Sequence, residues 1–368
     1  MPGNAVLRPF MDGAPAMTST GSPEHVDSAK AAGLRYVTDA MPGITRKRRG
    51  KGFAYVAPDG RAVRERGAIQ RFRSLVIPPA WTNVWICPIE NGHLQVTARD
   101  ARGRKQYRYH PRFREQRDGT KFERLFDFGE VIWKIREAVE RDVALEGLPR
   151  RKVLATLVWL LERTFIRVGT EELSRINKSY GLTTLRKKHV EVDGSELRFE
   201  FRGKSGVEHA VTVDDERIAR IVQRCHDLRG EILFKYIDDD GKRREIEAAD
   251  VNDYLAEITG GEVTAKDFRT WAGTMIAAEY LRSIGPAPTL KQANKNVVAA
   301  IDHTAERLGN TRAVCRKYYI HPTLIAAYLE GNVLPPVHRK RVKVRRPGGK
   351  LRRHEAEVLE FLRDHDAR

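Results

Sequence analysis

The spacing of apolar side chains changes from a period of two to a helical period near residue 117, and that change limits the folds open to this chain. From about residue 34 to 112, apolar and polar residues alternate in short runs separated by turns such as Pro58-Asp59-Gly60, as in antiparallel strands. After the polar stretch QRDGT at residues 116–120, apolar residues recur at helical spacing. The sequence predicts an α+β chain, with a small β-rich N-terminal domain over residues 29–116 and a mainly helical domain over 117–336.

The helical part contains one β insertion. The run VLATLVWLLERTFIRV at residues 153–168 is apolar enough to form a central core helix. Residues 189–213 instead alternate with a period of two, and the GKSG segment inside them predicts a hairpin with Lys204 in its turn. Further helices are expected at about 249–258, 265–283, 290–308, 311–319 and 322–330, with Thr264, Thr289 and Thr311 as N-caps and Pro322 at a first helical position.

The two ends of the chain differ in composition from the parts between them. Residues 1–28 are rich in Gly, Ser, Thr, Pro and Ala, with one arginine and no apolar run, which predicts a disordered lead and not a signal peptide. Residues 337–354 hold nine Lys and Arg and no acid. We expect residues 337–368 to be a basic C-terminal extension with a short amphipathic helix from Glu355 to Asp364.

Charge indicates the class of partner. The 67 Lys and Arg against 49 Asp and Glu give a formal net charge of +18, which is typical of proteins that bind polyanions and favours double-stranded DNA. No apolar run reaches the ~18 residues that a membrane span needs. The three cysteines, Cys87, Cys225 and Cys315, are odd in number and far apart, which fits free thiols in the cytosol. Neither CxxC nor HxxxH spacing occurs, so no metal site is expected.

Several cations stand where a fold could bring them to a phosphate. Arg167 lies in the apolar run TFIRVG, where it could instead pair with Glu162 or Glu171. Arg269 lies between two aromatic residues in KDFRTWAG, where cation–π packing on Trp271 is the alternative. Lys204 could be an ordinary exposed turn lysine. The sequence AVCRKYYIHP adds two adjacent phenols, Tyr318 and Tyr319.

The order of these segments is more informative than any one of them. FIRVG, GKSG, KDFRTW and GNTRAVCRKYY, in that order, resemble type IB DNA topoisomerases, in particular the compact poxvirus-like form found in bacteria. AGLRYVTDAMPGITRKRRGKGFAY, IPPAWTNVWICP and ARGRKQYRYHP are similar to the N-terminal domain of that family. The resemblance covers roughly residues 30–335 and implies the catalytic fold that this family shares with the tyrosine recombinases.

The resemblance implies a role for each candidate in the helical domain. Arg167 and Arg269 would hold the non-bridging phosphate oxygens, and Lys204 would be the general acid for the 5′-oxygen, assisted by Arg167. The family often has histidine nine residues before its nucleophile, whereas this chain has Asn310. An amide can donate a hydrogen bond to phosphate but cannot exchange a proton near neutral pH, which leaves an electrostatic role. An N-cap is the alternative role for Asn310.

The same spacing separates the two tyrosines. Nine residues after Asn310 is Tyr319. Adjacent residues on a helix point about 100° apart, so only one phenol can face the cations. Tyr319 is therefore the predicted nucleophile, and Tyr318 is expected to pack or to contact the DNA backbone.

In the N-terminal domain, Gln106, Tyr107 and Tyr109 match the family's Gln-Tyr-x-Tyr segment, which contacts DNA bases and backbone in the major groove. Arg104, Lys105 and Arg108 interleave with them as expected phosphate contacts. An ordinary hairpin with aromatic cross-strand pairs is the alternative.

The resemblance implies a DNA topoisomerase, an ATP-independent isomerase. It would relax supercoiled duplex DNA through a covalent 3′-phosphotyrosyl intermediate, strand rotation and religation, without ATP, metal or another cofactor. We expect a monomer that closes as a clamp around double-stranded DNA in the cytoplasm, at the nucleoid. Two alternatives remain: a tyrosine site-specific recombinase, for which residues 355–364 could be a docking helix, and a non-catalytic nucleoid DNA-binding protein supported by charge alone.

Overall fold

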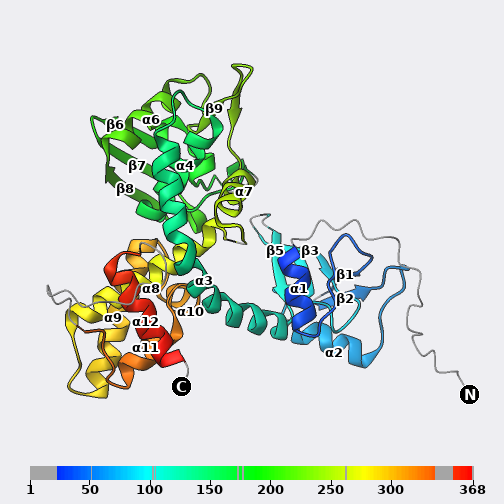
Figure 1. Ribbon diagram of the computed structural model, residues 1–368. Helices are drawn as coiled ribbons and strands as arrows, with labels where there is room; N and C mark the ends of the chain where they lie inside the picture. The colour runs from blue at the N-terminus through cyan, green and yellow to red at the C-terminus, as the bar shows by residue number, and fades with distance from the viewer. Residues whose placement is uncertain are drawn as a thin grey trace, which may run out of the picture. The chain divides into compact units, whose positions relative to one another are not determined.

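The computed structural model describes residues 23–50, 52–101, 103, 105–171, 174–175, 178–261, 263–335 and 351–366. The chain forms two compact units that divide between Arg117 and Asp118 (Figure 1). The α+β class predicted from the sequence is confirmed, with strands dominating the first unit and helices the second.

The first unit is built on a five-stranded antiparallel sheet of order β2-β1-β3-β4-β5. The inward side chains of this sheet, among them Ile86 and Val96, pack against Phe72 of α2. Its elements are α1 (Pro23–Ala31), β1 (Ile44–Arg49), β2 (Gly52–Val56), α2 (Arg66–Ser74), β3 (Thr82–Ile86), β4 (Leu94–Arg99) and β5 (Lys105–Tyr109).

Two features of this region differ from the sequence prediction. Residues 23–28, assigned to a disordered lead, are helical in α1, because Ala29, Ala32 and Leu34 form a buried cluster with Phe113. Residues 1–22 lie outside the described part. The stretch QRDGT does not break the chain but lies inside the long helix α3 (Pro111–Val143). One glycine costs a helix only about 1 kcal/mol relative to alanine, so it can be accommodated within a long helix.

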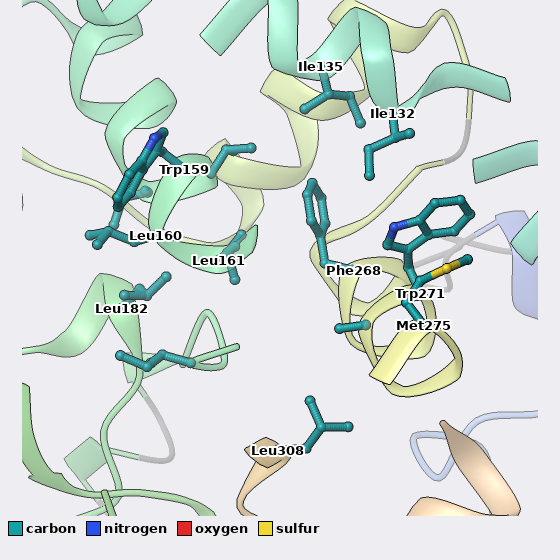
Figure 2. Close-up of a cluster of buried hydrophobic side chains, with 14 of the residues drawn as sticks. Ile132, Ile135, Trp159, Leu160, Leu161, Leu182, Phe268, Trp271, Met275 and Leu308 are labelled. Carbon is teal, nitrogen blue, oxygen red and sulfur yellow. The ribbon is translucent and has the colours of Figure 1, made fainter. Parts of the chain in front are cut away.

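The second unit surrounds the core helix predicted at residues 153–168, which the structure places at α4 (Arg150–Thr164). Nearly every side chain of α4 from Lys152 to Leu161 is buried. Figure 2 shows Trp159, Leu160 and Leu161 of α4 in one cluster with Phe268, Trp271 and Met275 of α8 and with Ile132 and Ile135 of α3. The helix ends at Phe165 in the left-handed conformation (φ 58°), two residues before Arg167.

The β insertion is a three-stranded antiparallel sheet of order β6-β7-β8. Leu197, Phe199 and Phe201 alternate along its middle strand and point into the core, as their period of two predicts. The remaining elements of the second unit are η1 (Leu182–Thr184), η2 (Lys187–His189), β6 (Val190–Asp193), β7 (Glu196–Arg202), η3 (Lys204–Gly206), β8 (Glu208–Asp214), α6 (Glu216–Asp227), β9 (Lys235–Ile237), β10 (Arg243–Glu245), α7 (Ala248–Thr259), α8 (Ala265–Ile284), α9 (Leu290–Leu308), α10 (Arg312–Tyr318), α11 (Pro322–Leu329) and α12 (Arg353–Asp366).

The predicted helix starts are confirmed. The Thr289 and Thr311 hydroxyls accept hydrogen bonds from the backbone N–H groups of Gln292 (3.2 Å) and Val314 (3.4 Å), and Thr264 is the N-cap of α8. Pro322 occupies the first turn of α11. The Thr289 and Thr311 hydroxyls thus satisfy backbone donors that have no partner within their own helix.

Helix α12 is the amphipathic helix expected from Glu355 to Asp364, but it packs into the second unit and is not a separate tail. Val358, Leu359 and Leu362 are buried in the same core as α4 and α8. Figure 1 shows α12, in red, beside α11 and α8 of its own chain. The apolar side of α12 is therefore covered by α8 and α11 of its own chain. In the recombinase alternative, this helix would instead dock on another protomer. Residues 336–350 lie outside the described part.

Candidate active site

Arg269 is the most deeply buried cation of the predicted site. It lies on the second turn of α8, is 4% exposed, and donates hydrogen bonds to the carbonyl oxygens of Phe165 and, at 2.6 Å, Leu308. Its guanidinium carbon is 5.2 Å from the centre of the Tyr319 ring, so it contacts Tyr319 and not Trp271 as the alternative had it. Burial and the neighbouring charge of Arg167 lower the pKa of Arg269. The ends of α4 and α9 thus orient this guanidinium toward Tyr319.

Arg167 and Asn310 contact each other. The Arg167 Nη2 donates a hydrogen bond of 2.5 Å to Asn310 Oδ1, which leaves the Asn310 amide nitrogen buried without a hydrogen-bond partner among the described residues. Thr311, not Asn310, caps α10. Glu162, proposed as an alternative partner of Arg167, pairs instead with Arg136 at 2.7 Å. An unsatisfied buried N–H donor next to an arginine is available for an incoming oxyanion.

The two adjacent tyrosines lie in different surroundings. Tyr319 follows α10 as its C-cap and is partly buried against the main core beside Arg269. Tyr318 is 38% exposed, with the Lys317 ammonium 5.2 Å from its ring centre. The structure therefore brings Tyr319 to the arginines and leaves Tyr318 on the surface.

The backbone of Tyr319 packs closely against helix α8 at Gly273. The Tyr319 carbonyl oxygen lies 2.4 Å from where a Cβ on Gly273 would be, so only glycine at this position of α8 allows so close an approach. Next to it, the Thr274 hydroxyl donates a 3.3 Å hydrogen bond to the same carbonyl and accepts one of 3.1 Å from the His321 N–H. Gly273 is four residues after Arg269, so both lie on the same face of α8.

Lys204 is exposed at the hairpin tip, in η3. An ordinary turn lysine would also be exposed, but the Lys204 charge lowers the pKa of Tyr319, which places it within electrostatic reach of the phenol. Burial alone would raise the pKa of Tyr319. The charges of Arg269, Arg167 and Lys204, with a hydrogen bond from Arg269, outweigh burial and bring that pKa below its ordinary value of 10.

Among the described residues, no carboxylate forms an ion pair with Arg167, Lys204 or Arg269. Buried arginines normally acquire a counter-ion or carbonyl partners, because an uncompensated charge is costly to desolvate. Arg269 has carbonyl partners but no anion. A site that gathers three cations without an acid is suited to bind a phosphate group.

Sequence reasoning did not identify His209 as part of this cluster. It lies on β8, and burial followed by the charges of Arg167 and Arg269 lowers its pKa. In the sequence His209 is one member of an alternating strand, and alternation gives the face of a residue but not its distant neighbours. Its position at the end of the GKSGVEH segment carried no signal of its own.

The predicted DNA-contacting residues of β5 do not share one face, because side chains alternate along a strand. Tyr107 is 48% exposed, and Lys105 lies on the same face but pairs with Asp39 at 2.7 Å. Tyr109 is partly buried against Phe113.

On the other face of β5, the Gln106 amide donates a 2.9 Å hydrogen bond to Asp100, and Arg108 lies over the Trp81 ring. Arg104 lies outside the described residues. Tyr107 is therefore exposed, whereas Tyr109 packs against Phe113 of α3 and stacks on Tyr107 of its own strand. Its cross-strand partner is Leu94, so the aromatic cross-strand pair of the alternative is not formed at Tyr109.

The described residues contain no group of three or more His, Cys, Asp or Glu side chains that could hold a metal ion. None of their helices is long and apolar enough to cross a membrane. All three cysteines are buried free thiols.

Both units match known protein families. Residues 110–331 match the model for the catalytic core of eukaryotic DNA topoisomerase I, and residues 52–100 match that for the N-terminal domain of bacterial DNA topoisomerase IB. The first match spans all the site residues from Arg167 to Tyr319.

Curated relatives agree with these models. DNA topoisomerase 1B of Acanthamoeba polyphaga mimivirus is 35% identical over 287 residues, covering 76% of this chain and 85% of the viral protein. DNA topoisomerase 1B of vaccinia virus (strain Copenhagen) is 26% identical over 249 residues, or 65% of this chain and 73% of that protein. Among solved structures, XerH site-specific recombinase bound to difH substrate in a pre-cleavage complex matches at a TM-score of 0.33 and 12% identity, over 51% of this chain and 49% of that chain. That score is too low to relate the two folds.

Proposed function

The chain belongs to the type IB DNA topoisomerases, and we propose that Tyr319 is the nucleophile of its DNA cleavage reaction. The activity class follows from the family matches, which favour a topoisomerase over a recombinase. The assignment of individual residues is supported by one observation: Arg269 lies against the Tyr319 ring and the charge of Arg167 lowers the pKa of Tyr319, whereas Tyr318 is exposed. Asn310 joins this group through its hydrogen bond from Arg167.

The cations act on the charge of the phosphate. When a phenol oxygen attacks a phosphodiester, negative charge accumulates on the equatorial oxygens of a five-coordinate phosphorus. Arg167 and Arg269 bind those oxygens, and the unpartnered Asn310 N–H donates a further hydrogen bond. Each such donor is worth roughly 10²–10³ in rate where water is excluded.

Proton transfer completes the step. The Tyr319 hydroxyl loses its proton to solvent as its oxygen bonds to phosphorus, a loss that its lowered pKa assists. The bond from phosphorus to the 5′-oxygen breaks, and Lys204 donates a proton to that oxygen. The products are a 3′-phosphotyrosine and a free 5′-hydroxyl. After strand rotation the 5′-hydroxyl attacks phosphorus and returns its proton to Lys204. The bond from phosphorus to the Tyr319 oxygen breaks, and that oxygen regains a proton from solvent. Because the phosphotyrosine conserves the bond energy, this scheme consumes no ATP.

Plasmid relaxation tests the nucleophile. We expect the wild-type chain to relax supercoiled plasmid in EDTA without ATP, Tyr319→Phe to lose this activity, and Tyr318→Phe to retain it. Tyr318→Phe is the matched control, since both variants remove one hydroxyl from adjacent residues. Loss of activity in Tyr318→Phe alone would overturn the assignment.

We also propose that the chain acts as a monomeric clamp around duplex DNA at the nucleoid. Two separate compact units joined by the continuous helix α3, with exposed Lys47, Arg48 and Arg49 on β1 of the first, support this proposal. Sedimentation of the chain with a short duplex should give one protein per DNA. A complex containing two or more chains would argue against a monomeric clamp, and a fluorescent fusion excluded from the nucleoid would contradict the location.

A further inference from the structure

His209 lies between two segments that carry site residues. On β8 it is the direct cross-strand partner of Phe201, with ring centres 5.0 Å apart and planes 8° from parallel. Stacked rings across a strand pair hold one another in a fixed orientation. The imidazole of His209 is therefore anchored on β7 and points along the hairpin toward its tip.

Two glycines show where the ring edge lies. A Cβ on Gly203 would be 2.5 Å from His209 Cδ2 and 2.6 Å from Nε2, and a Cβ on Gly309 would be 2.6 Å from Cε1. Gly203 has φ −95°, which any residue can adopt, so backbone conformation does not require glycine there. The imidazole occupies the space that a side chain at either position would need.

Each of these glycines immediately precedes a predicted site residue. Gly203 precedes Lys204, and Gly309 precedes Asn310. Among the described residues, the tip's backbone hydrogen bonds close on themselves, from Gly203 N to the Val207 carbonyl and from Gly206 N to the Gly203 carbonyl. No backbone hydrogen bond of the described part joins the tip to the turn between α9 and α10. Within the described part, the His209 ring lies against both the tip and this turn.

We propose that His209 is a positioning residue that holds the hairpin tip against the Gly309–Asn310 turn and so sets the reach of Lys204 to the leaving oxygen. The proposal rests on the proposed function, in which Lys204 is the general acid. Burial and the charges of Arg167 and Arg269 lower the pKa of His209, so the ring is neutral at pH 7 and adds no repulsion to the cation cluster.

The size of the effect follows from what Lys204 contributes. General acid catalysis is worth about 10²–10⁴-fold, and a displacement of ~1 Å can cost ~10²-fold. Removal of the ring frees the tip without removing the lysine. We therefore expect His209→Ala to slow single-turnover cleavage by about 10- to 100-fold, less than Lys204→Ala.

A substrate with sulfur in place of the bridging 5′-oxygen separates positioning from a general structural role. A thiolate leaves without a proton, because thiols ionise near pKa ~8.5, so this substrate needs no general acid. The readout is the ratio of cleavage rates on the sulfur and oxygen substrates, which does not depend on the fraction of folded enzyme. We expect that ratio to rise above wild type in His209→Ala and Lys204→Ala and to be unchanged in Arg269→Ala.

The matched control is His189→Ala. His189 is also buried and lies near Phe201, with ring centres 6.5 Å apart, but its ring neighbour on the other side is Tyr180. The ratio of cleavage rates on the sulfur and oxygen substrates should be the same for His189→Ala as for wild type. A wild-type ratio in His209→Ala would overturn the proposal if Lys204→Ala raises it. If Lys204→Ala does not raise the ratio, the general acid assignment itself fails, and the proposal fails with it.

A double variant checks the contact directly. The added methyl of Gly203→Ala would displace the imidazole, so this variant alone should also raise the ratio. In the presence of His209→Ala there is no ring to displace, so the double variant should cleave the oxygen substrate about as fast as His209→Ala alone. Independent, multiplying defects would show that the ring does not act through Gly203.

Discussion

Gly273→Ala is expected to separate catalysis from stability. The added Cβ would lie 2.4 Å from the Tyr319 carbonyl oxygen and 2.8 Å from the Tyr319 Cβ. Ordinary contact begins at 3.4 Å, so the Tyr319 backbone must move by about 1 Å relative to α8. Arg269 lies one helical turn away on α8, so this shift displaces the nucleophile from its principal cation.

The two consequences differ in size. Overpacking costs about 1–3 kcal/mol, and replacing a helical glycine by alanine returns about 1 kcal/mol, so the free energy of unfolding should fall by only ~0–2 kcal/mol. A ~1 Å misplacement of a reacting group can cost ~10²-fold in rate. We therefore expect a folded protein that binds duplex DNA normally and cleaves it about 100-fold more slowly.

Denaturant unfolding, DNA binding and single-turnover formation of the covalent adduct measure these three quantities. Gly129→Ala on α3 is the matched control, because its Cβ would meet Leu359 Cδ1 at 2.5 Å and the Trp271 ring at 3.1 Å, which are side-chain atoms and not the backbone of Tyr319. It should change stability and not the rate. Wild-type cleavage by stably folded Gly273→Ala would refute the argument that this close approach positions Tyr319.

Four further substitutions test other parts of the account. Asn310→Ala removes the unpartnered N–H donor and should slow single-turnover cleavage about 100-fold with little change in DNA affinity. Glu355→Gln breaks the pair with Arg136 (2.6 Å) and should lower the free energy of unfolding by about 1–3 kcal/mol at pH 7. Burial raises the pKa of Glu355 but Arg136 lowers it further, to below its ordinary 4.5, so the difference from wild type should disappear as pH falls through that lowered pKa. Lys47 is exposed, so Lys47→Ala should reduce the slope of log affinity for DNA against log salt concentration by about 1. The guanidinium of Arg46 instead donates hydrogen bonds to three carbonyl oxygens of the loop before β3. Arg46→Ala should therefore lower thermal stability without changing that slope.

Local patterns in the sequence accounted for much of the second unit. The capping threonines, Pro322 and the alternation of Leu197, Phe199 and Phe201 each act within a few residues, so they can be recognised without a fold. The spacing between Asn310 and Tyr319 also placed the second tyrosine, and not the first, beside the arginines.

The predictions that failed depended on contacts between distant residues. Helix α1 is ordered by packing against Phe113. Helix α12 was predicted as a helix, but its packing against α8 and α11 could not be read from its own pattern. Gly273 and His209 also act through contacts with distant segments. Gly273 closely approaches Tyr319, and His209 closely approaches Gly309, and the sequence pattern does not reveal either contact. On β5, alternation was visible in the sequence, but the burial of Tyr109 depends on what lies beneath the sheet.

The covalent intermediate tests the central claim most directly. A duplex with a single cleavage site, incubated with the protein, denatured in SDS and digested with protease, should give a DNA-linked peptide. Mass spectrometry should locate the 3′-phosphate on Tyr319. Attachment to Tyr318, or a phosphotyrosine at the 5′ end of the broken strand, would contradict the account.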